Sequence, residues 1–409
     1  MRTILHCDLN NFYASVEMKF HPEFYGRPLA VCGDPKKRHG IVLAKNQLAK
    51  KAGVITGEAI WQAQQKCPDL VLVPPHYAEY VKHSGQVFEI YKRYTDRVEP
   101  FGIDECWLDV TESLPLLGTG KEIADEIRER VKIETGLTVS VGVSFTKIFA
   151  KLGSDLKKPD ATTEISPENF KSVVWPLEVS EMMMIGKKTA KVLNLMGIHT
   201  IGDLAAADVE ALKRSFGKIA QGMHDNANGI ETEEVNSAFF ERAPKSVGNG
   251  TTTAQDMASY EDAAAVIYAL SEQVAMRLRS CNMEANGVSL NIKYPDFEGI
   301  SRQLAFDYST SNATDLAEGA LCLLKENHSF AKCPLRAVTV TAIKLTPEDS
   351  SQISFFDEKR DKESRLERAA DKIRSKYGYS ALRRGITLGN DVIIGHKLAA
   401  EDDFLPFKH

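Results

Sequence analysis

Strand-like and helix-like segments alternate along the first 165 residues of the chain. Short apolar runs that stop at a glycine or polar residue are typical of buried strands, and amphipathic runs follow them. The clearest pair is the helix 120–136, where Ile123, Ile127 and Val131 recur at helical spacing, and the strand 137–144. Such a chain buries its strands by laying helices over a sheet, which predicts an α/β or α+β layer.

Two later regions differ from this first one. Residues 175–235 read as helices and tight turns, whereas residues 242–345 return to strands and helices. In the strand 287–294, apolar residues alternate with polar ones, which predicts a sheet with one buried and one solvated face. The elements expected in this region are strand 245–256, helix 261–281, strand 287–294, strand 300–308, helix 313–326 and strand 335–345. A chain of 409 residues is too long for one core, so we expect two to four domains.

The composition is that of an ordinary globular protein, with 43% hydrophobic and 26% charged residues. We expect no membrane segment, because no apolar run is long enough to span a bilayer. The seven cysteines show no CxxC spacing, so we expect reduced thiols in a cytoplasmic protein. The net charge of −5 gives little support for a nucleic-acid partner, and phosphate contacts must therefore come from local patches.

Carboxylates end or precede two apolar strands. Asp8 closes the strand Arg2–Asp8, and Asp104 and Glu105 stand directly before the buried residues 106–108. Charges beside a buried strand are unfavourable unless something compensates them. If the two strands are neighbours, three carboxylates converge, and this donor set suits Mg²⁺. Taken alone, Asp8 also fits a turn or cap residue, and the acidic pair also fits a solvated corner.

Four segments then point to a family. They are "HCDLNNFYASVE" (6–17), "GIDECWLDVT" (102–111), "VSVGVSFTKIFAKLGSDLKKPD" (139–160) and "IGKKTAKVLNLMGIHTIGDL" (185–204). In this order and with these separations, the chain resembles the Y-family translesion DNA polymerases of the DNA polymerase IV type. The resemblance covers residues 1 to about 345. It implies low-fidelity, template-directed synthesis past damaged bases by a monomer that binds primer-template DNA and dNTP.

The resemblance also implies an α+β, multidomain right-hand polymerase. A catalytic palm with a ferredoxin-like βαββαβ fold would comprise residues 1–19 and 76–165, and small fingers would comprise 20–75. A helical thumb with helix-hairpin-helix motifs would follow at 166–236, and a βαββαβ little finger at 242–345. Residues 346–409 would be a C-terminal tail, which is polar and charged in sequence, with one late amphipathic helix expected around Leu366–Tyr377.

By the same resemblance, two Mg²⁺ ions, for which Mn²⁺ can substitute, would be held by Asp8, Asp104, Glu105 and the carbonyl of Leu9. Tyr13 would close over the sugar and exclude a 2′-hydroxyl group. Gly33 and Ile41 would roof the new base pair. The nucleotide would be contacted by Asn11, Phe12, Tyr13, Lys45, Lys50 and Lys158. The alternatives are plain core packing for Tyr13 and Phe12, a turn glycine at Gly33 and a solvated lysine at Lys45.

The chain departs from the family pattern in the fingers and the thumb. Lys45, Gln47 and Lys50 stand where the family usually has Thr, Tyr and Arg, so the positive charge is kept without the bidentate fork of arginine. The first thumb hairpin, 182–189, has Met183 where glycine is common, and a second candidate is 215–222. Ten basic and eleven acidic residues in 242–345 predict weak DNA affinity. The residues expected to touch DNA are Gly186, Lys187, Lys188, Gly217, Lys218, Lys245, Arg277, Lys293, Arg302 and Arg336.

The tail contains "QISFF" (352–356), an apolar cluster in a polar segment. It resembles the peptide by which bacterial polymerases bind the sliding clamp, through Gln352, Ile353, Phe355 and Phe356. The alternative is a local staple against the little finger. Two other functions stay open at this point. A nucleotide cyclase would lack the thumb and little finger, and a non-catalytic adaptor of the family would lack the metal carboxylates.

Overall fold

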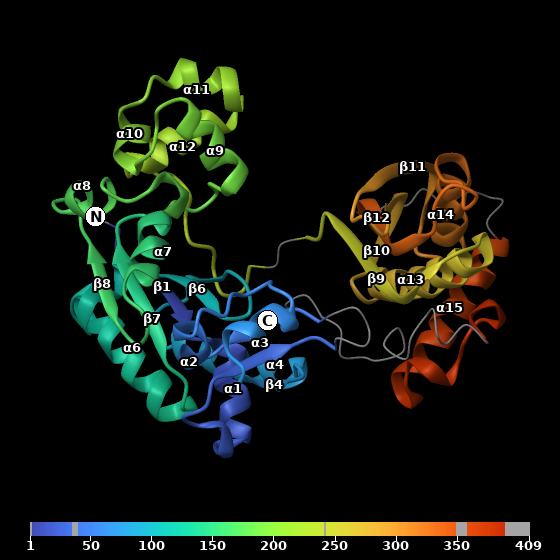
Figure 1. Cartoon of the computed structure of the whole chain (residues 1–409), viewed down its shortest axis with the longest axis horizontal. Helices are drawn as coiled ribbons and strands as arrows, with labels where there is room; N and C mark the ends of the chain where they lie inside the picture. The colour runs from blue at the N-terminus through green and yellow to red at the C-terminus, as the bar shows by residue number, and fades with distance from the viewer. Residues whose placement is uncertain (1, 35–39, 241–242, 349–357, 389–409) are drawn as a thin grey trace. The chain divides into compact units, whose positions relative to one another are not determined.

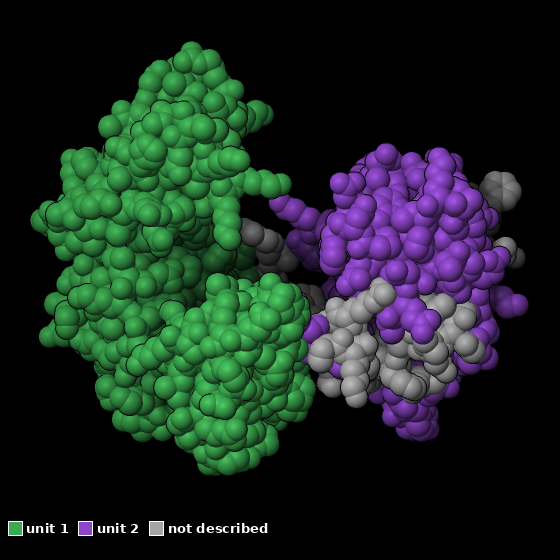
Figure 2. Space-filling view, viewed as in Figure 1, with its two compact units in different colours: residues 1–32, 42–241, 405–409 green, residues 33–41, 242–404 purple. Residues whose placement is uncertain are grey.

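The computed structural model describes the chain except residues 1, 35–39, 241–242, 349–357 and 389–409. The chain divides into two compact units (Figure 2). The first is built mainly from residues 42–241 together with the first 32 residues, and the second mainly from residues 242–404. None of the helices in the described ranges is long and apolar enough to cross a membrane.

A five-stranded sheet, here called the palm sheet, forms the centre of the first unit (Figure 1). Its strand order is β5 (Val98–Pro100), β6 (Glu105–Asp109), β1 (Ile4–Leu9), β7 (Val139–Ser144) and β8 (Thr162–Ile165). Helices α4 (Tyr77–Tyr91) and α6 (Gly120–Thr135) share one apolar core with this sheet. Helix α7 (Lys147–Leu156) lies against strands β1 and β7. The predicted layer of helices over a sheet is therefore confirmed.

Successive side chains of β1 point to opposite faces of the palm sheet, one toward the apolar core and the other toward the carboxylates. Leu5, Cys7 and Leu9 belong to the core shared with α4 and α6, and Cys7 lies opposite Cys106 of β6. Every second residue therefore points to the other face, which carries α7. Asp8 lies on that face, with Glu105 directly opposite it in register.

Gly142 of β7 allows α7 to lie unusually close to the sheet. A Cβ atom at this position would lie 1.9 Å from the carbonyl oxygen of Ala150 and 2.5 Å from the amide nitrogen of Ser154. Any side chain at residue 142 would therefore push α7 away from the sheet. The close contact brings the polar residues of α7 next to the ends of β1 and β6.

A small three-stranded sheet follows the first helix, α1 (Phe12–Phe20). Its order is β3 (Val42–Lys45), β2 (Leu29–Cys32) and β4 (Val71–Val73), and helices α2 (Gln47–Lys51) and α3 (Ile60–Lys66) belong to the same region. Asn46 caps α2 through its side chain, which accepts a hydrogen bond from the amide of Ala49. These elements occupy the range expected for the fingers.

Short helices make up the range expected for the thumb. They are α8 (Phe170–Val174), α9 (Lys187–Leu195), α10 (Ile201–Ala206), α11 (Val209–Phe216) and α12 (Ile219–Ala227). Their apolar residues share a core with Phe149 and Leu152 of α7. The thumb helices are therefore packed on the same helix that borders the carboxylates.

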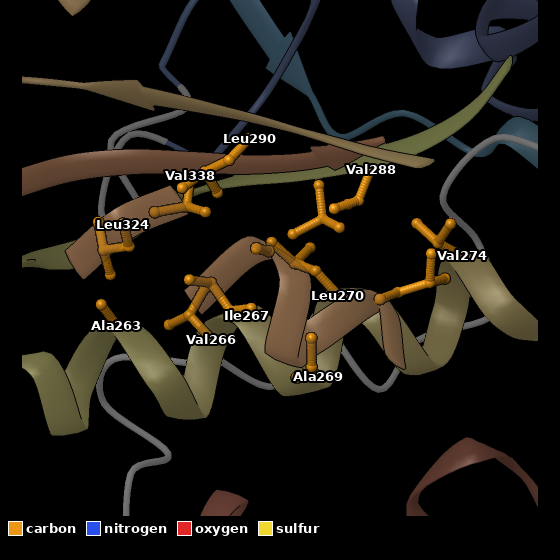
Figure 3. Packing of buried hydrophobic residues seen from close by; sticks show 14 of the residues in the cluster. Ala263, Val266, Ile267, Ala269, Leu270, Val274, Val288, Leu290, Leu324 and Val338 are labelled. Carbon is orange, nitrogen blue, oxygen red and sulfur yellow. The ribbon is translucent and has the colours of Figure 1, made fainter. Parts of the chain in front are cut away.

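The second unit contains a four-stranded antiparallel sheet, here called the little-finger sheet. Its order is β11 (Gly299–Thr310), β10 (Met283–Lys293), β12 (Leu335–Pro347) and β9 (Ser246–Met257). Helices α13 (Tyr260–Ser280) and α14 (Ala313–Asn327) pack on one face, where Leu270 and Val288 lie in the core (Figure 3). The predicted order of two helices and four strands, and the alternation in β10, are confirmed.

A further helix, α15 (Glu358–Tyr377), belongs to the second unit. We expected only a late amphipathic helix in a polar tail, so this helix begins earlier than predicted. Glu272 and Arg279 of α13 are each only 5% exposed. Arg279 forms two hydrogen bonds to the Asp371 carboxylate, of 2.6 and 2.9 Å, and Glu272 accepts a 2.7 Å hydrogen bond from Arg374. The tail is therefore attached to α13 by buried charges.

Candidate active site

Three carboxylates meet where β1 and β6 lie side by side. Asp8 lies opposite Glu105 in the antiparallel register, and the amide of Leu9 donates a 3.0 Å hydrogen bond to the carbonyl of Asp104. Asp8 is only 6% exposed. The structure therefore brings together all four positions expected at the metal site.

Electrostatics show how close these carboxylates are. Burial and the charges of Asp8 and Glu105 raise the pKa of Asp104 to about 7. Burial also acts to raise the pKa of Glu105, but hydrogen bonds from His6 and Lys151 outweigh it and hold that pKa at about 2. The three carboxyl groups therefore lie too close together for all of them to be ionised easily at neutral pH. A bound cation would offset the repulsion between their charges.

Two lysines of the α7 region supply positive charge. Lys158 Nζ lies 2.7 Å from Asp8 Oδ2, and Lys151 Nζ lies 2.7 Å from Glu105 Oε2 and 3.5 Å from Asp8 Oδ2. Asp155 contacts both lysines, at 2.8 Å from Lys158 and 3.4 Å from Lys151. Each lysine is therefore shared between the carboxylate site and Asp155.

The donor set fits a hard divalent cation. Asp8, Asp104 and Glu105 offer carboxylate oxygens, and Leu9 offers a carbonyl in the same place. As the side chains stand, no group of three His, Cys, Asp or Glu residues in the described part of the chain has metal-binding geometry. Lys151 and Lys158 occupy the carboxylate oxygens instead, and these contacts would have to loosen for a cation to bind.

Tyr13 lies in an aromatic cluster next to this site. Its ring stacks on Tyr80 with a centroid distance of 4.1 Å and an interplanar angle of 10°, and Tyr77 meets it edge-on at 6.0 Å. Burial and the nearby charge of Asp104 raise the pKa of the Tyr13 hydroxyl to about 12. The half-exposed Tyr13 thus borders the carboxylates, whereas Phe12 is buried in the core.

Asn11 begins α1 in a left-handed conformation, with φ at +51°, and its side chain makes no cap hydrogen bond. Asparagine tolerates this conformation better than most residues. Asn11 occupies the N-cap position but leaves the first-turn amides without a side-chain cap, so these N–H groups can donate hydrogen bonds to a phosphate.

The fingers carry a second group of positive charges. The Lys45 ammonium donates a 2.9 Å hydrogen bond to Thr56 Oγ1, and burial and the nearby Lys50 charge lower its pKa. Lys45 and Lys50 are therefore near enough for their charges to interact. Gly33 donates a 3.2 Å hydrogen bond to the carbonyl of Ile41, whose side chain is exposed.

Both thumb hairpins place glycine at a helix end. Gly186 is the N-cap of α9, with Lys187 and Lys188 exposed in its first turn, and Gly217 ends α11 with φ at +63° before the exposed Lys218. The left-handed residue of the first hairpin is Met184, with φ at +71°. The turn of this hairpin therefore lies directly after Met183, the residue that departs from the family pattern.

The little-finger residues predicted to touch DNA do not form one patch. Lys293 is on the sheet face away from α14, whereas Arg302 pairs with the buried Leu290 and bonds to Asn327 of α14. Arg336 lies over the ring of Phe297 at 4.7 Å, and Arg277 donates to the carbonyl of Gly248 at 2.9 Å. Lys245 is exposed just before β9.

The predicted clamp-binding residues Gln352, Ile353, Phe355 and Phe356 lie outside the described residues.

Sequence reasoning missed His6, Lys151 and Asp155, which support the carboxylates, whereas Lys158 was expected as a nucleotide contact. His6 is fully buried, lies 3.3 Å from Glu105 and forms a 2.8 Å hydrogen bond with Ser154. Lys151, Asp155 and Lys158 recur at spacings of four and three residues, which places them on one side of the α7 region. This spacing in the sequence could have indicated a polar cluster. Only the structure shows that this side of the α7 region faces the carboxylates of the palm sheet.

Comparisons with known proteins agree with this geometry. Residues 7–155 match the impB/mucB/samB family, and residues 244–355 match the C-terminal domain of that family. The chain is 48% identical over 390 residues to a DNA polymerase IV of Acetivibrio thermocellus, covering 95% of this chain and 98% of that one. It is 36% identical to DNA polymerase IV 1 of Bacillus subtilis, covering 95% and 93%.

A solved Y-family DNA polymerase chimera of Dbh and Dpo4 has a similar fold. The TM-score is 0.75 at 23% identity, and the match covers 84% of this chain and 99% of the chimera. The chain therefore belongs to the Y-family DNA polymerases, in the branch of the bacterial DNA polymerases IV. It is a DNA-directed DNA polymerase for translesion synthesis, and it works on a primer-template with dNTP substrates.

Proposed function

We propose that the polymerase uses two Mg²⁺ ions, or Mn²⁺ in their place, at Asp8, Asp104, Glu105 and the carbonyl of Leu9. The observation that supports this proposal is the strand register, which places Asp8 opposite Glu105. In the same place the amide of Leu9 donates a hydrogen bond to the carbonyl of Asp104. When bound, such ions would activate the primer 3′-hydroxyl group and neutralise the triphosphate. Y-family DNA polymerases depend on a divalent metal, whatever the number of ions.

The protein's own groups would orient the nucleotide. Lys158 is close enough to the carboxylates to pair with a triphosphate that lies over Asp8. The uncapped first-turn amides of α1 face the same end of the strand, and Lys45 and Lys50 add two ammonium groups on the fingers. Tyr13 would pack against C2′ of the sugar, so that a ribonucleotide clashes. Catalysis is then positioning and charge neutralisation, without a side-chain nucleophile.

Asp104→Asn tests the metal site. Asparagine keeps the shape of aspartate but loses the charge, so we expect loss of primer extension by a factor of about a thousand or more, with the fold retained. Extension is measured on a labelled primer, and thermal unfolding checks the fold. Asp155→Asn is the matched control, because Asp155 contacts the lysines and is not a proposed ligand. Extension by Asp104→Asn at the wild-type rate would refute the site.

We also propose that the segment 352–356 binds the sliding clamp and that the enzyme acts as a cytoplasmic monomer. The little finger, residues 242–345, has ten basic and eleven acidic residues, so it has little positive charge for binding DNA. Tethering to a clamp would raise the local concentration at the primer end without new DNA contacts. Alanine at Gln352, Phe355 and Phe356 should abolish stimulation by the clamp and leave basal extension unchanged. If the triple variant is stimulated normally by the clamp, the segment does not bind the clamp, and the alternative of a local staple against the little finger holds.

A further inference from the structure

A buried carboxylate lies one helical turn behind the proposed sugar gate. Glu17 is 1% exposed and follows Tyr13 by four residues, so both are on the same side of α1. Burying a carboxylate is unfavourable unless hydrogen-bond donors satisfy it. Its donors are the hydroxyl of Tyr80 in α4 and Nδ1 of His76, the residue before that helix. His76 Nδ1 lies 2.9 Å from Oε1 and 3.1 Å from Oε2.

Tyr80 connects this carboxylate to the gate. Its fully buried ring is the surface on which Tyr13 stacks, and its hydroxyl donates to Glu17. A ring that is held at its hydroxyl cannot tilt or slide without breaking that hydrogen bond. The plane on which Tyr13 rests is therefore set from its far end by Glu17.

His76 extends the same restraint to the start of α4. It immediately precedes that helix, and Tyr77, the first residue of the helix, meets Tyr13 edge-on. Glu17 therefore holds two of the aromatic neighbours of Tyr13: Tyr80 directly, and Tyr77 through His76. An aromatic gate that excludes one hydroxyl group needs such restraint, because a displacement of about 1 Å can change a rate by about a hundredfold.

We propose that Glu17 is a positioning residue for sugar discrimination, acting on Tyr13 through Tyr80 without touching the nucleotide. This inference rests on the proposed role of Tyr13 as the sugar gate. It predicts that Glu17 sets the preference for deoxyribonucleotides over ribonucleotides. A role in stability alone would change the unfolding temperature and leave this preference unchanged.

The experiment measures kcat/KM for one dNTP and for the matching rNTP in the full-length enzyme. Glu17→Ala should lower the ratio of the two values by about tenfold. Glu17→Gln should lower it less, because its side-chain oxygen still accepts from Tyr80 while the second oxygen, which His76 also contacts, is lost. Glu231→Ala is the matched control. Glu231 is a buried carboxylate that accepts a 2.5 Å hydrogen bond from the amide of Lys147, away from α1 and α4.

Tyr13→Ala and the double variant Glu17→Ala/Tyr13→Ala separate the possible outcomes. If Glu17 acts through the gate, the double variant has the same ratio as Tyr13→Ala. An unchanged ratio in Tyr13→Ala refutes the gate itself. A reduced ratio in Tyr13→Ala with a wild-type ratio in Glu17→Ala and Glu17→Gln refutes the positioning role alone. If Glu17→Ala does not fold, Tyr80→Phe decides, because it keeps the ring under Tyr13 and removes the hydroxyl that donates to Glu17. A wild-type ratio in Tyr80→Phe then refutes the positioning role.

Discussion

Buried charges occur in both units of the molecule, but with different partners. Beside the palm sheet, Asp8 and Glu105 are paired with Lys158 and Lys151. On the outer face of α13, Glu272 and Arg279 are paired with side chains of the tail, including Arg374, Arg384, Glu367 and Asp371. Lysine supplies the first cluster with positive charge, and arginine supplies the second.

This difference fits the task of each cluster. A lysine ammonium is a compact charge without fixed direction, and it can move to another partner such as Asp155. An arginine guanidinium binds a carboxylate through two parallel hydrogen bonds, as Arg279 does with Asp371. The lysine cluster can therefore yield its carboxylates to a substrate or cation, whereas the arginine cluster holds the tail in place.

The largest expected effect is on the arginine cluster. Arg279→Ala leaves Asp371 and Glu367 without their buried partner, so we expect the second unit to lose about 3–5 kcal/mol of unfolding free energy. Urea unfolding with a fluorescence probe measures this loss. Arg277 lies on the same helix and donates a hydrogen bond to the carbonyl of Gly248, so Arg277→Ala should cost about 1 kcal/mol. Equal losses in both variants would contradict a special role for the tail contacts.

A smaller effect is expected at Lys151. In Lys151→Ala, the repulsion among Asp8, Asp104 and Glu105 is less compensated, so the first unit should lose about 1–2 kcal/mol without Mg²⁺. Adding Mg²⁺ should then raise the unfolding temperature more in the variant than in the wild type, because the ion meets no competing ammonium. Lys157→Ala removes an exposed neighbouring charge and is the control. An identical Mg²⁺ response in all three proteins would show that Lys151 does not compete with the ion.

The smallest effects come from exchanging the two cations. Arg279→Lys removes one arm of the bidentate contact and should cost about 1–2 kcal/mol in urea unfolding. Lys151→Arg should hold Glu105 more firmly and raise the Mg²⁺ concentration for half-maximal primer extension a few fold. If both exchanges are silent, the choice of lysine or arginine does not distinguish the clusters.

Parts of this picture could be predicted from the sequence. Asp8, Asp104 and Glu105 stand at strand ends, and strand register alone brings such positions together. The little-finger elements were predictable because the strand residues near Val288 alternate between apolar and polar. The domain boundaries and the roles of individual site residues stay predictions.

Other parts depend on contacts between distant residues. Glu17 and Tyr80 are 63 residues apart, and nothing local to either indicates their hydrogen bond. Helix α15 was expected only around Leu366–Tyr377, because the charged residues before Leu366 show no apolar pattern. It docks through charge pairs with α13, so apolar periodicity, the usual sign of a docked helix, is weak. Lys151 was missed for the same reason, since its partners lie on two other elements.

The paired thiols behind the carboxylates have a kinetic consequence. Cys7 and Cys106 lie opposite each other in β1 and β6, and burial raises the pKa of both. Neutral, enclosed thiols react with an alkylating reagent only while the strands separate. The labelling rate of these two cysteines therefore reports how often β1 and β6 separate, and with them Asp8 and Glu105. A bound cation or nucleotide should slow this labelling.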